Sequence, residues 1–219
     1  MEDRIKYMKR IKIILVLVLA LLLYSCYTTN FIQINDPAEN LLILVNKENK
    51  IPDDFGINLI SIKDIYVAEV LLNDLIEMQN AALEENIRIM INSAWRNSDK
   101  QEQIFNNTVA DFVNDGNSQD VALEKAKKIS ALPGYSEHET GLAIDFTNGG
   151  SYEDKLEMWD WLSKNAHKYG FILRYPQGKE DITGYDYEAW HYRYVGKHNA
   201  EIMFENDLCL EEYLYTLNK

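Results

Sequence analysis

Cysteine and proline are both scarce in this chain. Its 219 residues include two cysteines, Cys26 and Cys209, and four prolines. Because the cysteines lie far apart and the first follows an apolar run, a disulfide framework is not supported. No internal repeat and no long low-complexity tract is present, which argues against repeat architectures. The length and the 47% hydrophobic content indicate one well-packed globular domain.

Positive charge is also in short supply. Lysine and arginine number 22 against 35 aspartates and glutamates, which gives a formal net charge of -13. Binding to nucleic acid depends on clustered lysine and arginine that neutralise phosphates. We therefore expect no nucleic-acid partner.

The N-terminus is the one basic part of the chain. Lysine and arginine cluster before residue 13, directly ahead of the apolar run 13–23. This layout is typical of a bacterial export signal. Leu23-Tyr24-Ser25-Cys26 resembles a lipobox, in which the cysteine is lipidated after cleavage. The uncharged stretch 13–29 is near the lower limit of about 17–25 residues for a membrane-spanning helix, so a lipoprotein, an uncleaved anchor and plain secretion all stay open.

Each of these alternatives places the folded part of the chain outside the cytoplasm, because the basic flank stays on the cytoplasmic side. We expect 1–29 to be a signal peptide or membrane anchor, 30–40 a linker and 41–219 the folded domain. The domain is expected to be a monomer tethered to the outer face of the cell membrane.

The pattern of apolar residues predicts an α+β domain around a small, mostly antiparallel sheet flanked by helices. In the helix expected over 64–86, the residues Val67, Val70, Leu71, Ile76 and Leu83 form the core-facing stripe. Further helices are expected at 99–113, 118–129 and 153–169 and in the tail from 199. Ser118 is the expected N-cap of the second of these, and Gly170 the C-cap of the third, which buries Leu156. Strands are expected at 41–45, 87–95, 143–147, 171–175 and 189–195.

Two segments carry candidate chemistry, one over residues 136–145 and one over 188–191. A catalytic zinc ion needs about three histidine or carboxylate ligands and an open position for water. His138, Asp145 and His191 would supply this set, with Gly141 allowing a tight chain reversal between the first two. Glu188 would then be placed to take a proton from the water.

Bland interpretations of the same residues stay open on spacing alone. Histidine and carboxylate pairs at these spacings occur by chance, and single histidines are often hydrogen-bonded core residues. Arg96, just past the strand ending near 95, could steady an oxyanion or bind a carboxylate, but such an arginine is more often a surface ion-pairing residue. Trp190 is expected in the sheet core together with Tyr192 and Tyr194, and His167 and His198 are expected at the surface.

A family resemblance decides between these interpretations. Ser-x-His-x-x-Gly-x-Ala-x-Asp at 136–145 and Glu-x-Trp-His-Tyr-Arg-Tyr-Val-Gly at 188–196 resemble the VanY-type D-alanyl-D-alanine carboxypeptidases. Agreement at 44–49, with Pro52 nearby, and at 93–96 extends the resemblance over about 41–200. Two departures are Ala189, where the family usually has proline, and Trp95-Arg96-Asn97, where Tyr-Arg-Ser is commoner. Neither removes a metal or proton-transfer group.

The resemblance implies a fold, a cofactor and roles for seven residues. The fold is that of the lysostaphin, D-Ala-D-Ala peptidase and hedgehog-type zinc domains, and the cofactor is Zn²⁺. The roles are zinc ligation by His138, Asp145 and His191, general base catalysis by Glu188, transition-state stabilisation by Arg96, and contact with the C-terminal end of the substrate by Ser136 and Gln101. The implied reaction is removal of the C-terminal D-Ala from a peptidoglycan stem peptide.

Two alternatives to this function remain. An L,D-carboxypeptidase acting on tetrapeptide stems would use the same metal centre with a differently shaped pocket. A wall-binding module would keep zinc for stability without turnover, although the presence of Glu188 and Arg96 argues against it.

Overall fold

The computed structural model describes residues 41–217. The expected leader at 1–29, with Cys26, and the linker at 30–40 lie outside these residues. Within 41–217, none of the helices combines the length and the hydropathy needed to cross a membrane.

A four-stranded sheet forms the centre of the domain. Its strands are β3 (Met90–Ser93), β4 (Ala143–Thr147), β5 (Phe171–Leu173) and β6 (His191–Tyr194), in the order β3-β4-β6-β5. Every neighbouring pair is antiparallel, as the sequence predicts. A separate antiparallel hairpin is made by β1 (Leu59–Ile62) and β2 (Ile65–Ala68). The positive φ angles of Lys63 and Asp64 form the tight turn between them.

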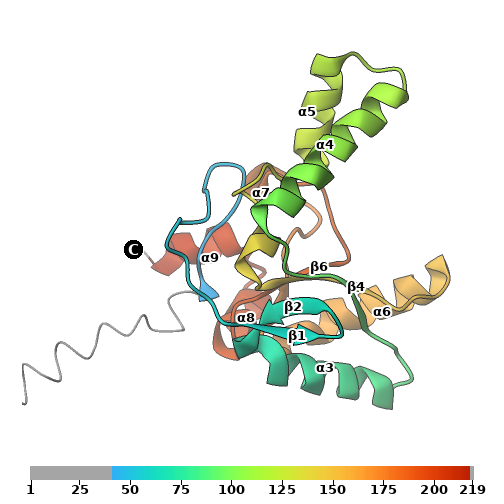
Figure 1. Cartoon of the computed structure of the whole chain (residues 1–219). Helices are drawn as coiled ribbons and strands as arrows, with labels where there is room; N and C mark the ends of the chain where they lie inside the picture. Colours follow the sequence, from blue (N-terminus) through green and yellow to red (C-terminus); the bar gives the residue numbers. More distant parts are fainter. Residues whose placement is uncertain (1–40, 218–219) are drawn as a thin grey trace, which may run out of the picture. The chain divides into compact units, whose positions relative to one another are not determined.

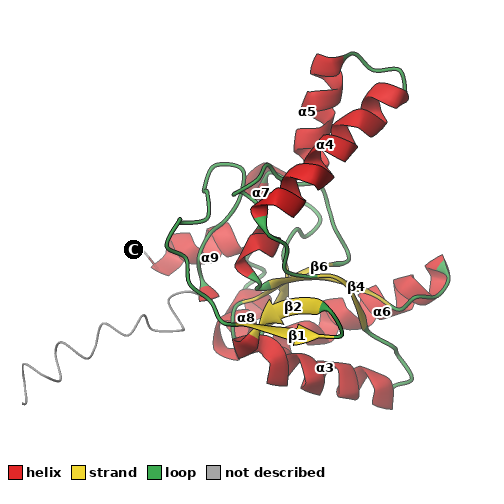
Figure 2. Cartoon of the chain, viewed as in Figure 1, coloured by secondary structure: helices red, strands yellow, loops and turns green. Residues whose placement is uncertain are grey.

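Helices surround the sheet (Figures 1 and 2). In chain order they are η1 (Glu69–Leu71), α3 (Leu72–Glu84), α4 (Ser98–Asn114), α5 (Gln119–Ile129), η2 (Glu137–Thr140), α6 (Tyr152–Asn165), η3 (Ala166–Tyr169), α7 (Glu180–Thr183), α8 (Lys197–Glu205) and α9 (Leu210–Leu217). Ser118 caps α5 by accepting the N–H of Val121, and Gly170 ends η3 in the left-handed region, both as predicted.

The main core lies between the sheet and α3 and α6. Leu75 and Met78 of α3 and Met158 and Leu162 of α6 are buried in one cluster with Phe146 of β4. The α4–α5 hairpin projects away from the sheet (Figure 1) and has a small core of its own, made by Phe105, Val109, Ala122 and Ala126. The main core is thus formed between the sheet and α3 and α6, and the α4–α5 hairpin extends away from it.

The helix predicted over 64–86 is wrong in its first third. The chain there completes β2 and a 3₁₀ turn before α3 begins at Leu72. The predicted stripe is wrong at Val70, Ile76 and Leu83, which are exposed. Val67 and Leu71 are buried, as predicted. The side chains that α3 buries are Leu75, Met78 and Ala82. They lie on a different face of the helix from Ile76 and Leu83, because the helix begins later than predicted.

The strand predicted over 41–45 is also wrong. Leu41 and Val45 are buried, but the carbonyl oxygens of Leu41 and Ile43 accept hydrogen bonds from the Arg193 guanidinium. These carbonyls therefore bind an arginine side chain in place of the backbone N–H groups of a neighbouring strand. Leu156, predicted as core, is exposed on α6.

Candidate active site

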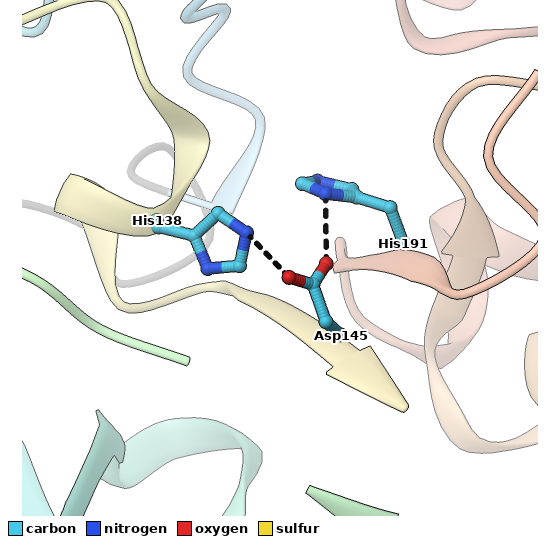
Figure 3. A group of neighbouring side chains, drawn as sticks. All are labelled: His138, Asp145 and His191. Carbon is cyan, nitrogen blue, oxygen red and sulfur yellow. Dashed lines mark ion pairs between the residues drawn. The ribbon is translucent and has the colours of Figure 1, made fainter. Parts of the chain in front are cut away.

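Three side chains meet where η2, β4 and β6 approach one another. His138 lies in η2, Asp145 in β4, and His191 is the first residue of β6. Asp145 and His191 are direct partners in the β4–β6 register. One ligand atom from each of the three residues lies within 4.8 Å of the others. Figure 3 shows the three side chains turned toward one another. The structure thus brings together the three residues predicted to bind the metal.

Gly141 makes the turn between two of these residues possible. It ends η2 with a φ of 73° and donates its N–H to the carbonyl of His138. Its own carbonyl accepts the N–H of Ala68 at 2.9 Å. A β-carbon here would lie 2.7 Å from Cδ2 of Leu59 and 3.3 Å from the nitrogen of Ala68. The position needs glycine for its backbone angle and for the close approach of the β1–β2 hairpin.

The hydrogen bonds of His138 determine which of its nitrogens faces the site. Nδ1 lies 2.8 Å from the carbonyl oxygen of Ala94, which can only accept, so Nδ1 carries the proton. Nε2 then presents its lone pair toward Asp145, whose Oδ2 is 3.4 Å away. Nε2 is buried and has no hydrogen-bond partner among the described residues.

His191 presents the other ring nitrogen. Its Nδ1 lies 3.2 Å from Oδ1 of Asp145, and its Nε2 lies 3.3 Å from Oε2 of Glu137. Two imidazole nitrogens and a carboxylate therefore converge in a buried place. This donor set, three protein ligands with room for a fourth, is the one that zinc takes at catalytic sites, so the residues present fit the ion.

Glu188 lies beside the three. Its Oε2 is 3.6 Å from Nδ1 of His191, and its carbonyl accepts the N–H of the same residue, which closes a turn before β6. Burial raises the pKa of Glu188 above its usual value, and the negative charge of Asp145 adds to this. A largely buried carboxylate next to the three candidate metal ligands has the position expected of a general base.

Arg96 follows β3 and turns toward the same place. Its N–H donates to the carbonyl of His138 at 3.3 Å, and its guanidinium lies 3.4 Å from Oγ of Ser93 and 3.5 Å from Oγ of Ser136. A cavity of about 230 Å³ is lined by Arg96 and Ser136 together with the three metal-facing residues and Glu188. Arg96 is therefore a residue of the site and not a surface ion-pairing residue.

Gln101 lies behind the wall of this cavity. It is fully buried in α4 and is not among the residues that line the cavity. Its amide donates to the carbonyl of Ala131 at 2.6 Å, and Ala131 does line the cavity. Gln101 therefore supports backbone that lines the cavity and is not itself placed for the direct substrate contact that was predicted.

Two expectations for single residues are wrong. His167 is buried, with its ring stacked on Phe204 at 3.6 Å between centroids, because α8 packs over η3. Trp190 is 39% exposed and lines the active-site cavity, since it precedes β6 and escapes the sheet core. Tyr192 and Tyr194 are buried in the core and His198 is exposed, as predicted.

Several buried residues near the site were missed from the sequence. They are Glu137, Arg174 and Arg193, which form ion pairs, and the cavity-lining Tyr175 and Tyr185. One signal existed for Arg193, because residues two apart on a strand face the same side and Arg193 therefore shares a face with His191. Glu137 and Arg174 gave no such signal, since their partners lie far away in the sequence.

Comparison with known proteins places this chain in a family. The model of the VanY family, described as D-alanyl-D-alanine carboxypeptidase, matches residues 64–197. The chain belongs to the VanY family. A D-alanyl-D-alanine carboxypeptidase from Enterococcus faecalis is 36% identical over 182 residues, covering 83% of this chain and 68% of that protein. The putative carboxypeptidase YodJ from Bacillus subtilis is 37% identical over 201 residues, covering 83% and 69%.

Solved structures agree with the VanY fold. A mutant of the vancomycin resistance D,D-pentapeptidase VanY, in complex with Zn(II), superposes with a TM-score of 0.77 at 36% identity and covers 80% of this chain and 99% of its own. The LD-carboxypeptidase LdcB gives a TM-score of 0.69 at 37% identity, covering 82% and 88%. The predicted α+β fold class is thereby confirmed.

Proposed function

We propose that this VanY-family protein is a zinc D-alanyl-D-alanine carboxypeptidase that removes the C-terminal D-Ala from peptidoglycan stem peptides. The observation that carries the proposal is the convergence of His138, Asp145 and His191 beside Glu188, in a cavity that Arg96 also lines. VanYB, a related protein of known structure, has been solved in complex with D-Alanine-D-Alanine.

The residues divide the reaction between them. Zinc held by His138, Asp145 and His191 would supply a Lewis acid for the scissile carbonyl and for the attacking water. Glu188 takes a proton from that water as the hydroxide adds to the carbonyl carbon. It returns the proton to the nitrogen of the leaving D-Ala as the C–N bond breaks. The carboxylate of Glu188 thus carries out both proton transfers.

Arg96 and Ser136 are placed to bind oxygen atoms of the substrate. The guanidinium provides fixed donors for the oxyanion that forms when the carbonyl is attacked. Ser136, 3.5 Å from that guanidinium, provides a hydroxyl for the terminal carboxylate of the substrate. Gln101 contributes indirectly, because its amide positions the carbonyl of Ala131 in the wall of the cavity.

The first experiment measures D-Ala release from a pentapeptide ending in D-Ala-D-Ala, with zinc and with a chelator. We expect release that the chelator abolishes. Glu188→Gln should lower kcat about 10²–10⁴-fold, because an amide cannot accept the proton, while the zinc content stays unchanged. The matched control is Asp186→Asn, an exposed carboxylate two residues away, which should keep wild-type turnover. Full activity in the Glu188 variant would rule out this residue as the base.

L,D-carboxypeptidase activity is a second candidate, favoured by the similarity to LdcB. The same ligands and base would serve it, so the shape of the cavity decides between the two. Rates of D-Ala release from pentapeptide and tetrapeptide stems, compared on one enzyme preparation, separate the alternatives. Zinc binding without release from either substrate would instead support a wall-binding module.

The proposed location is outside the cytoplasm, with the domain tethered as a monomer to the outer face of the membrane through 1–29. The basic cluster, the apolar run and Cys26 support this location. Fractionation of cells expressing the full chain and Cys26→Ala tests it. Release of the variant into the medium indicates a lipid anchor, whereas retention in the membrane indicates a signal anchor. Recovery of the wild-type protein in the cytoplasm would refute the proposed location.

A further inference from the structure

A carboxylate that the proposed reaction does not use lies on the far side of His191. Oε2 of Glu137 is 3.3 Å from Nε2 of His191, while Nδ1 of the same ring faces Asp145. The Glu137 side chain is 1% exposed. The His191 ring is therefore held between two carboxylates, one in the metal site and one behind it.

Two arginines fix the position of Glu137. Nε of Arg174 and Nη1 of Arg193 each donate to Oε1 of Glu137 at 2.7 Å. Both arginine side chains are completely buried. Since Oε1 takes both guanidinium bonds, Oε2 is left to accept from His191.

The other guanidinium nitrogens of the two arginines also have hydrogen-bond partners. Arg174 makes a paired contact with the carboxylate of Glu211 in α9, at 2.9 and 2.7 Å. Nη2 of Arg193 donates to the backbone carbonyls of Leu41 and Ile43. Two arginines and two glutamates thus form a cluster with balanced charges. Charge-assisted hydrogen bonds fix the position of each side chain in it.

We propose that Glu137 is a positioning residue of the metal site: it accepts the Nε2 proton of His191 and thereby fixes Nδ1 as the nitrogen that faces the metal. Arg174 and Arg193 hold the carboxylate in place for this role. The inference rests on the proposed function, because it concerns the same metal centre. Partners of this kind orient a ligating imidazole and increase its basicity, and their loss typically weakens metal binding 10–100-fold.

Zinc affinity, measured by competition with a chromophoric chelator, tests the role directly. Glu137→Gln should bind zinc 10–100-fold more weakly than the wild type. Glu211→Gln is the matched control, because it removes a charge from the same cluster without touching His191. Its zinc affinity should stay within about threefold of the wild type, since it keeps the histidine partner. An equal loss in both variants, or no loss in Glu137→Gln, overturns the proposal.

A measurement on the unmodified protein guards against a variant that does not fold. Long-range ¹H–¹⁵N correlation spectra of the zinc-loaded wild type report which nitrogen of each histidine carries the proton. We expect a proton on Nε2 of His191 and on Nδ1 of His138. A proton on Nδ1 of His191 overturns the proposal. Failure of the wild type to bind zinc would refute the proposed function instead, so the two failures are distinguishable.

Discussion

Gly141 offers the sharpest test of how the local backbone builds the metal site. Replacing it by alanine places a β-carbon at a φ of 73°, 2.7 Å from Leu59 Cδ2 and 3.3 Å from the backbone nitrogen of Ala68. The left-handed angle costs an L-residue about 1–2 kcal/mol. Crowding of a packed site typically adds about 1–3 kcal/mol. The expected loss in free energy of unfolding is therefore about 2–5 kcal/mol.

Gly116 is the matched control for this substitution. It lies in the turn between α4 and α5 with a φ of 90°, but nothing lies within 4 Å of an added β-carbon. Gly116→Ala should therefore lose only the cost of the backbone angle, about 1–2 kcal/mol. The difference between the two variants isolates the contact with the β1–β2 hairpin.

Urea unfolding followed by circular dichroism, with a chelator present in every sample, measures both losses without a contribution from metal binding. The reasoning predicts that Gly141→Ala loses about 1–3 kcal/mol more than Gly116→Ala. It also predicts weaker zinc binding in Gly141→Ala alone, because that turn carries His138. Equal losses for the two variants would refute the steric argument.

Three further outcomes are expected. Zinc at 1,000 times its Kd should raise the free energy of unfolding by about 4 kcal/mol, and excess chelator should reverse this in thermal melts. Burial opposes ionisation of Glu137, but Arg174 and Arg193 outweigh it and hold its pKa well below the usual 4.5. Because this pKa is lower in the folded state, ionised Glu137 stabilises the fold above about pH 4.5, and this stabilisation is lost as the pH falls further. Acid below about pH 4.5 should therefore lower the free energy of unfolding more steeply in the wild type than in Glu137→Gln. Tyr194→Phe, which removes the 2.7 Å hydrogen bond to Asp74, should cost about 1–3 kcal/mol in urea unfolding; an unchanged midpoint would show that water replaces the bond.

The sequence by itself determined the parts of this protein that depend on neighbouring residues. The 136–145 segment contains His138 and Asp145, and the 188–196 segment contains Glu188 and His191. Each segment is a short motif that resembles the VanY family, so the resemblance predicts the site without a fold. The apolar periodicity of single helices and strands and the N-cap at Ser118 are likewise local. These features gave the fold class and the candidate site.

The tertiary structure decided everything that depends on distant partners. Whether Asp145 meets His191 is set by the β4–β6 register, and the burial of His167 is set by the packing of α8. Glu137 is separated from Arg174 and Arg193 by 37 and 56 positions in the chain. Sequence patterns report the period of a helix or strand, but a buried ion pair exists only when folding excludes water from both partners at once.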